Sequence, residues 1–372
     1  MDFLKDYQLL IADGKDSPFM NRYDVYQDGT TPMYRDTDGT LWAMSGHSHL
    51  GRIAMFSGKT LEDMTLQYYI NTNFSVGHAD YAFSGIRYPE GIRARGSIWP
   101  FGLYICPNTH RFFCFFHNET GWKAQGTNYD SRGYCDRPAF DSDFRHIGLM
   151  HSDDEGRSWI FDRWVVTAET VAATDLFVPD GQNIIPQKSG RICLGSGDFS
   201  CFIDEEYIYL FYNMSRVNMD TELWEHCDVY VARTRRREDG IMGDFVKYYD
   251  GAFCEAGNFG KESVIVADAW HPRVIYLKKY GIYLMTASDL QYENPKQFIR
   301  DVMAMRVSTD LLHWSDKICA EKDGVPFGNH YVAMVSDDGM NQPNICEGDD
   351  VKVLTNHNGT DVLMYPSKWI KK

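Results

Sequence analysis

Gly195-Ser196-Gly197-Asp198-Phe199-Ser200-Cys201-Phe202-Ile203 is a short apolar run with an acidic residue, Asp198, near its beginning. The acidic turn Asp204-Glu205-Glu206 follows, and then a second, aromatic-rich run, Tyr207-Ile208-Tyr209-Leu210-Phe211-Tyr212. Short runs of aromatic and β-branched residues bounded by Gly, Asp or Asn are typical of β-strands. The stretch therefore predicts a β-hairpin whose first strand starts at Asp198.

The same strand–turn–strand pattern recurs along the chain, with a different polar residue at the start of each unit. The units cover residues 31–44, 99–116, 198–212, 271–285 and, more weakly, 330–354. Repeated hairpins of this kind indicate a ring of small sheets around a central channel. We therefore predict an all-β, five-bladed β-propeller that forms a single catalytic domain over residues 1–372. We expect the strand near residues 9–12 to complete the last blade, and the leading polar residues to meet at one end of the channel.

A third strand follows in some units and ends in a recognisable turn. The clearest example is the Asp-box Ser152-Asp153-Asp154-Glu155-Gly156-Arg157-Ser158-Trp159, and residues 308–314 form a looser copy. The Asp and Ser side chains can bond to their own backbone, and the Gly permits a positive φ. We expect a structural role for this motif, at the outer rim of the sheets.

The composition narrows the classes of partner. The 372 residues are 44% hydrophobic, and 22 Phe, 23 Tyr and 9 Trp supply strand formers and surfaces that stack on sugar rings. A net charge of -15 argues against nucleic acid, because no basic patch is available to release counterions. No run of about 18 apolar residues occurs, so we predict no membrane span.

The cellular compartment is inferred from the first residues and the cysteines. Met1-Asp2-Phe3-Leu4-Lys5-Asp6 lacks the basic start and apolar core of a signal peptide. The nine cysteines are odd in number and include no Cys-x-x-Cys pair, which indicates free thiols in a reducing compartment. We predict a cytoplasmic protein, although a secreted or periplasmic chain trimmed of its leader would look the same.

The repeat resembles the five-bladed, furanosidase-type glycoside hydrolases of family 43. That resemblance implies one acidic residue at the start of blades one, three and four, acting as general base, pKa-tuning carboxylate and general acid. Asp198 stands where the tuning aspartate would. Trp99-Pro100 is similar to the family's Trp-Ala-Pro, and Gly328-Asn329-His330 resembles a Gly-His whose histidine lines the pore and can bind a structural cation.

The chain departs from this pattern at two of the three acidic positions. Thr31-Pro32 replaces the expected Ala-Asp-Pro, so that Asp28 and Asp24 are the nearest carboxylates. His271-Pro272 replaces Gly-Pro after the expected acid, where Trp270 stands. The related family 117 uses a histidine as its acid, which implies His271, or alternatively His330, as the proton donor. Glu262 and Glu255, in the preceding loop, are alternative acids.

These residues predict a glycoside hydrolase that acts on an oligosaccharide or polysaccharide fragment, with inversion. The candidate catalytic residues are Asp198 as the orienting carboxylate, Asp28 as the base, and His271 or Glu262 as the acid. The candidate substrate contacts are Trp99, Trp122, Trp270, His117, Glu119, Arg145 and His146. No cofactor is required, His330 is the candidate ligand for a structural cation in the pore, and the oligomeric state stays open.

Three alternatives remain open from the residues alone. A sialidase-like hydrolase would need three arginines that grip a carboxylate, for which Arg35, Arg145 and Arg273 are available. A polysaccharide lyase would use a His/Tyr pair, with His271, His117 or His330 as its histidine. A glycan-binding propeller without catalysis would explain the missing carboxylates.

Overall fold

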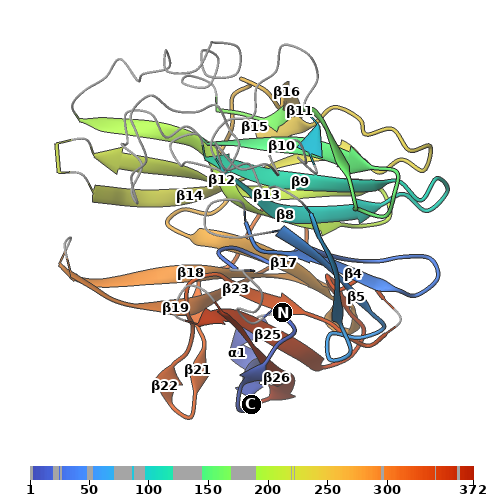
Figure 1. The fold of residues 1–372 in the computed structure, drawn as a ribbon. Helices are drawn as coiled ribbons and strands as arrows, with labels where there is room; N and C mark the ends of the chain where they lie inside the picture. The colour runs from blue at the N-terminus through green and yellow to red at the C-terminus, as the bar shows by residue number, and fades with distance from the viewer. Residues whose placement is uncertain are drawn as a thin grey trace.

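The computed structural model describes residues 3–19, 25, 27–47, 53–70, 86–87, 97–119, 145–168, 190–218, 220–221, 223–294, 297–339, 341–357 and 361–372. Over these residues the protein is all-β, as the sequence predicts (Figure 1). The helical segments described are α1 (Phe3–Asp6) and the 3-10 turn η2 (Lys278–Tyr280). Neither has the length and apolar character that crossing a bilayer requires.

The main strands form antiparallel groups that follow one another along the chain. The first comprises β3 (Met33–Arg35), β4 (Leu41–Ser45), β5 (Ile53–Gly58) and β6 (Thr65–Ile70). The second comprises β8 (Ser97–Ile105), β9 (Phe112–Glu119), β10 (Arg145–Ser152) and β11 (Trp159–Val166). The third comprises β12 (Arg191–Ile203), β13 (Tyr207–Asn218), β14 (Leu223–Arg235), β15 (Val246–Tyr249) and β16 (Ala252–Ala256). The fourth comprises β17 (Trp270–Leu277), β18 (Ile282–Asn294), β19 (Gln297–Ser308) and β20 (Ile318–Cys319).

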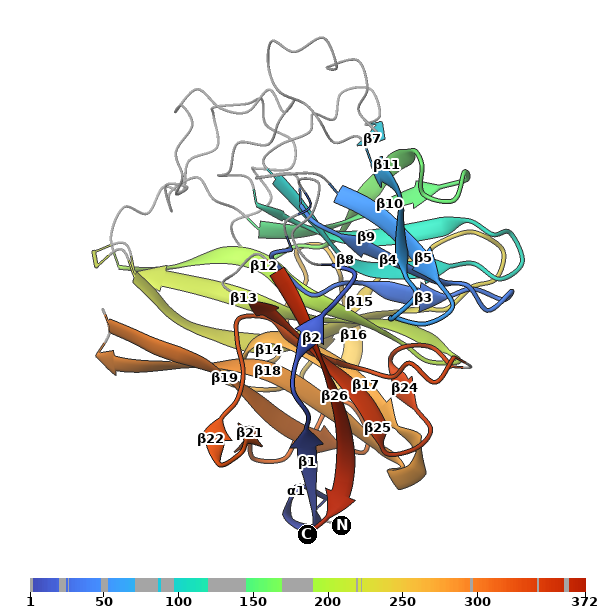
Figure 2. The same ribbon diagram turned by 60° about the horizontal axis from the view of Figure 1, so that its bottom comes forward.

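The fifth group combines both ends of the chain. It comprises β23 (Val332–Val335), β25 (Asp350–His357), β26 (Asp361–Lys371) and β1 (Tyr7–Ile11). β1 pairs with β26 from Tyr7 opposite Lys371 to Ile11 opposite Ser367, and the two strands lie side by side in Figure 2. The prediction that the strand near residues 9–12 joins the last unit is confirmed.

Short strands extend or connect these groups. β2 (Lys15–Asp16) pairs with β26, and β21 (Glu321–Lys322) pairs with β22 (Val325–Pro326). β7 (Ile86–Arg87) lies parallel to β11, and β24 (Ile345–Cys346) lies parallel to β17. One parallel pairing, between Arg145 and Gly195, links the second group to the third. It brings the start of β10 to β12, which matters for the site.

β9 shows how the sequence positions polar groups inside the molecule. Its first five residues, 112–116, are a continuous apolar run and are all buried, as expected of a strand packed on both faces. Its last three residues, His117, Asn118 and Glu119, are buried as well. Buried polar side chains need hydrogen-bond partners, so the end of β9 is the place to look for a site.

Both Asp-box turns are closed by their own side chains. Asp154 accepts hydrogen bonds from the Ser158 amide at 2.8 Å and the Ser158 hydroxyl at 2.6 Å, and the Trp159 indole donates to the Gly156 carbonyl at 2.9 Å. In the looser copy, the Trp314 indole donates to the Leu311 carbonyl at 3.1 Å. These local bonds fit a structural role.

Candidate active site

Asp198 lies at a break in the pairing between β12 and β13. Gly197 is opposite Asn213, and regular pairing resumes where Ser200 lies opposite Phe211. Asp198 has a φ of 43°, a left-handed conformation that is uncommon for a residue other than glycine. The sequence predicted that this strand starts at Asp198. β12 instead begins at Arg191, so Asp198 lies inside the strand. The irregularity acts like a β-bulge, which re-aims a side chain.

Two glycines before Asp198 let neighbouring strands come close. A Cβ atom on Gly197 would lie 2.2 Å from the His117 ring, and one on Gly195 would lie 2.3 Å from the Arg145 carbonyl oxygen. Gly195 also has a φ of 112°. The Gly-Ser-Gly run therefore brings the ends of β9 and β10 against β12.

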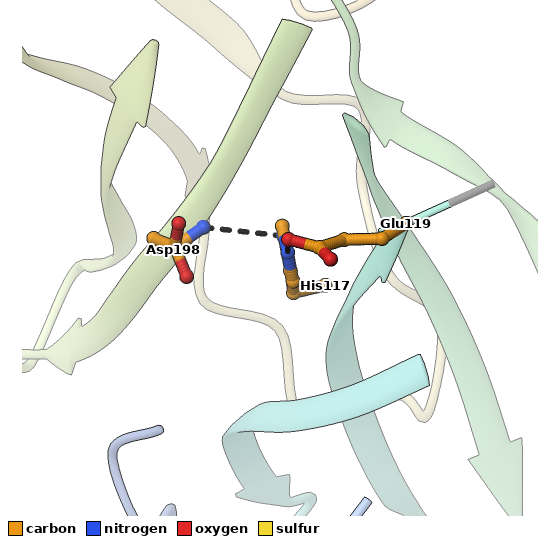
Figure 3. Close-up of side chains that lie close together, drawn as sticks. All are labelled: His117, Glu119 and Asp198. Carbon is orange, nitrogen blue, oxygen red and sulfur yellow. Dashed lines mark hydrogen bonds and ion pairs between the residues drawn. The ribbon is translucent and has the colours of Figure 1, made fainter. Parts of the chain in front are cut away.

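His117 connects β12 to Glu119 (Figure 3). The Asp198 backbone N–H donates to His117 Nδ1 at 3.1 Å, so Nδ1 must be unprotonated. The other ring nitrogen, Nε2, lies 3.0 Å from Glu119 Oε1 and therefore carries the proton that it donates. These two bonds fix a neutral imidazole in one tautomer.

Arg145 bridges the two buried carboxylates. Its Nη2 lies 2.7 Å from Glu119 Oε1, and its Nη1 lies 3.2 Å from Asp198 Oδ2. The Tyr331 hydroxyl donates to Asp198 Oδ1 at 3.0 Å. Burial alone would raise the pKa of Asp198, but its neighbours, among them the Arg145 guanidinium and the Tyr331 hydroxyl, lower it below its usual value. Asp198 is therefore ionised at neutral pH.

The pKa values of two histidines beside Tyr331 are shifted in opposite directions. The His271 ring lies 3.9 Å from the Tyr331 ring and 4.5 Å from the His330 ring, measured between centroids. Burial, with a further contribution from His330, lowers the pKa of His271 well below its usual value. His330 Nδ1 lies 3.2 Å from Asp301 Oδ2. Burial opposes the charge on His330, but Asp301 and the carboxylate of Asp28 raise its pKa.

Asp28 faces the same cluster from the segment before β3. The Gln27 side chain accepts from the Ser45 hydroxyl at 2.9 Å and the Gly46 amide at 2.8 Å, which anchors the segment. Although Asp28 keeps some exposed surface, burial of its carboxyl group raises its pKa to about 6. The positive charge of His330 opposes this shift, and a hydrogen bond from Trp99 also opposes it. Asp28 therefore changes its charge near neutral pH.

The cluster does not suit a cation. His117, Glu119 and Asp198 each offer one atom, all within 4.8 Å of one another, as three metal ligands would. However, Arg145 already donates to both carboxylates, and both nitrogens of His117 are used in hydrogen bonds. The guanidinium of Arg145 already supplies these carboxylates with the positive charge that a metal ion would bring. His330, the ligand predicted for a pore cation, is not part of this group.

The remaining candidates have different surroundings. Glu262 lies in a separate buried cluster, where its Oε2 is 2.8 Å from Lys247 Nζ and accepts from the Tyr212 hydroxyl at 2.6 Å. Trp270 is partly exposed beside His271, and His146 is fully buried against Trp164. Trp122 and Asp24 lie outside the described residues.

The three arginines of the sialidase alternative do not converge on one partner. Arg35 donates to the carbonyls of Gly39 and Lys59 at the hairpin turns. Arg273 donates to the Thr31 carbonyl at 2.9 Å. Arg145 is engaged with Glu119 and Asp198. Each guanidinium thus has its own structural partners.

Two members of the cluster were missed in the sequence. Tyr331 directly follows His330 at the start of the fifth unit, so the repeat could have indicated it. Asp301 lies within β19, opposite Leu290, and nothing in the local pattern distinguishes it. Its contact with His330 depends on the way that the fourth and fifth groups pack.

Comparison with known proteins gives no family by sequence: no family model matches the chain, and no curated protein matches it. Solved structures are similar over most of its length. A thermostable family-43 glycoside hydrolase is 14% identical, with 94% of this chain and 92% of that chain covered and a TM-score of 0.43. A family 117 glycoside hydrolase from Zobellia galactanivorans is 9% identical, with 98% and 90% covered and a TM-score of 0.48.

A third similar structure has another activity. It is an N-acetylgalactosamine deacetylase from F. plautii in complex with blood group B trisaccharide, 10% identical, with 95% and 96% of the chains covered and a TM-score of 0.43. Both families that the sequence resembles are thus among the similar structures. Because identities are 9–14% and TM-scores are below 0.5, we base the function on this chain's own residues.

Proposed function

We propose that the chain is a single-domain, five-bladed β-propeller whose leading residues share one cavity. Support comes from contacts between units that are far apart in the sequence. Tyr331 of the fifth unit bonds to Asp198 of the third, and Asn213 of the third accepts from the His271 amide of the fourth at 2.7 Å. Arg273 of the fourth unit donates to Thr31 of the first.

We propose that this propeller hydrolyses a glycosidic bond in an oligosaccharide, with inversion and without a cofactor. The observation that carries the proposal is one cluster with three groups in different charge states. Asp198 is held ionised, Asp28 has a pKa of about 6, and the pKa of His330 is raised. A base and an acid that titrate on either side of working pH are what acid–base catalysis needs.

The three groups have distinct roles in this proposal. Asp28 takes a proton from water as the water oxygen attacks the anomeric carbon. The C–O bond to the leaving group breaks, and His330 gives its Nε2 proton to the leaving oxygen while Asp301 holds Nδ1. Asp198 supplies negative charge that stabilises the cationic sugar at the transition state. His271, which is held neutral, packs against the rings of His330 and Tyr331 in place of the acid role predicted for it.

The test is a screen against plant and algal oligosaccharides, followed by variants on the substrate found. Asp28→Asn, His330→Gln and Asp198→Asn should each lower kcat by about 10²-fold or more. Glu205→Gln, in the exposed turn after β12, is the matched control and should leave kcat unchanged.

Other outcomes identify the alternatives. An unsaturated product that absorbs ultraviolet light would indicate a lyase. Sugar binding without release of reducing ends would indicate a glycan-binding propeller. Full activity of Asp28→Asn or His330→Gln would overturn the assigned roles.

A further inference from the structure

A cavity lies between the third and fourth strand groups, with a volume of about 450 Å³. One wall is the segment 265–268, which leads into β17, and the other includes Trp314 and Asp316, which follow β19. Arg306 of β19 also lines it. The cavity shares no lining residue with the cluster around Asp198. Its volume is typical of small-molecule sites.

Both walls are fixed by backbone hydrogen bonds. The Ile265 amide donates to the Val229 carbonyl of β14 at 2.9 Å. The Ser315 amide donates to the Val307 carbonyl of β19 at 2.9 Å, and the Val307 amide donates back to the Ser315 hydroxyl at 3.1 Å. The cavity is therefore already formed before any ligand binds.

Arg306 is the group that indicates a ligand. It is only 7% exposed, yet its guanidinium forms no hydrogen bond or ion pair with any residue that the structure describes, and its Nη1 is buried without a partner. A buried charged donor without an acceptor is costly. Such groups are usually satisfied by ligand or water oxygens.

The charges around Arg306 select the class of ligand. Asp268 and Asp316 line the cavity with two negative charges, against the two positive charges of Arg306 and Lys317. Lys317 is also paired with Asp289 at 2.6 Å, outside the lining. This balance gives no excess positive charge to hold an anion. Donors and acceptors side by side suit hydroxyl groups, which both donate and accept.

Trp314 adds a surface for a sugar ring. Its indole N–H is fixed on the Leu311 carbonyl, its ring packs edge-on to Phe211 at 6.3 Å, and it keeps some exposed surface on the cavity. An aromatic face packs well against the apolar face of a sugar. We propose that this cavity binds a neutral carbohydrate, with Trp314 under the ring and Arg306, Asp268 and Asp316 bonded to its hydroxyls. The inference goes beyond the proposed hydrolysis and does not depend on it.

The test follows the Trp314 indole N–H peak in ¹H–¹⁵N NMR spectra, assigned from Trp314→Phe. Xylotriose, arabinotriose and cellotriose are titrated into the Asp198→Asn chain, with trigalacturonate and inorganic phosphate as anionic probes. At least one neutral trisaccharide should shift this peak, with a Kd of about 1 mM. Arg306→Met should weaken binding about tenfold or more, and Arg235→Met, on the exposed Glu206 pair, should not.

Several results would overturn the proposal. One is that no neutral probe shifts the Trp314 peak at concentrations up to about 20 mM. Another is that only the anionic probes shift it. The third is that Arg306→Met binds the neutral probe as tightly as the unmodified chain does. Should Arg306→Met fail to fold, the exposed Asp316→Ala replaces it and should weaken binding several-fold. The peak reports this cavity alone, so a hydrolase without this site and a sugar-binding site without hydrolysis give different results.

Discussion

Asp28 and Asp198 carry the same functional group, but their surroundings move their pKa values in opposite directions. Asp198 has Arg145 and the Tyr331 hydroxyl as direct partners, which favour the carboxylate. Asp28 is buried near the negative charges of Glu119 and Asp198, which favour the neutral acid. Two carboxyl groups in different environments can thus divide the roles of charge stabiliser and titrating base.

The proposed roles predict a bell-shaped dependence of kcat/KM on pH. Below about pH 6 Asp28 becomes protonated and activity should fall, because its folded pKa is about 6. Activity should fall again as pH rises above the raised pKa of His330, because His330 then loses its proton. Asp301→Asn removes the partner that raises this pKa, so the alkaline limb should move to lower pH while the acid limb stays. An alkaline limb that does not move would contradict the role of His330.

Gly197 should be intolerant of any side chain. In Gly197→Ala the new Cβ would meet the His117 ring at 2.2 Å, so His117 must shift from Glu119 and Asp198. We expect a loss of about 1–3 kcal/mol in the free energy of unfolding, as for other overpacked sites, and a fall in kcat. Gly348→Ala is the matched control, because nothing lies within 4 Å of its Cβ. Urea unfolding and steady-state kinetics on both variants check this, and a normal kcat in Gly197→Ala would mean that the position of His117 is unimportant.

Strands and turns differ in how far the sequence predicts them. The hairpins β12–β13 and β17–β18 follow the repeat, because short aromatic runs and turn residues mark them. The Asp-box is predicted to the side-chain level, because all its bonds are local. The bulge at Asp198 and the Asp301–His330 contact were not predictable, because they depend on packing between strands far apart in the chain.

The Asp-box should contribute to stability and not to catalysis. Asp154→Ala removes the acceptor for both the amide and the hydroxyl of Ser158, so the free energy of unfolding should fall by about 1–2 kcal/mol. Chemical denaturation measures this, with kcat expected to be unchanged. Asp310→Ala is the equivalent change in the looser copy of the motif, where Asp310 accepts a hydrogen bond from the Leu312 amide. A large fall in kcat in an Asp154→Ala variant that is still fully folded would show that the turn supports the candidate active site.

Contacts between the sheets hold the whole molecule together. The described core forms several buried clusters, one of which packs β1 and α1 against strands of the fourth and fifth groups. The sequence predicted this arrangement in outline, because each unit contributes an apolar strand and a polar leading residue. It named Glu262 as an alternative acid, and the ion pair of Glu262 with the buried Lys247 has no local signal in the sequence.

Leu9 and Leu10 allow the contribution of β1 to be measured. Leu9 is 8% exposed and belongs to this cluster, whereas Leu10 is 57% exposed on the same strand. Leu9→Ala should lower the free energy of unfolding by about 2–4 kcal/mol. Leu10→Ala should change it by less than about 0.5 kcal/mol. Equal effects in thermal or urea unfolding would mean that the register of β1 against β26 is wrong.

The pairing of β1 with β26 also constrains folding during synthesis. Leu9 emerges from the ribosome long before its neighbour across the sheet, Trp369. Contacts between such distant segments form slowly, because a long loop must close first. The apolar face of β1 therefore stays unpaired until β26 has been translated. During that interval we expect chaperones to bind it.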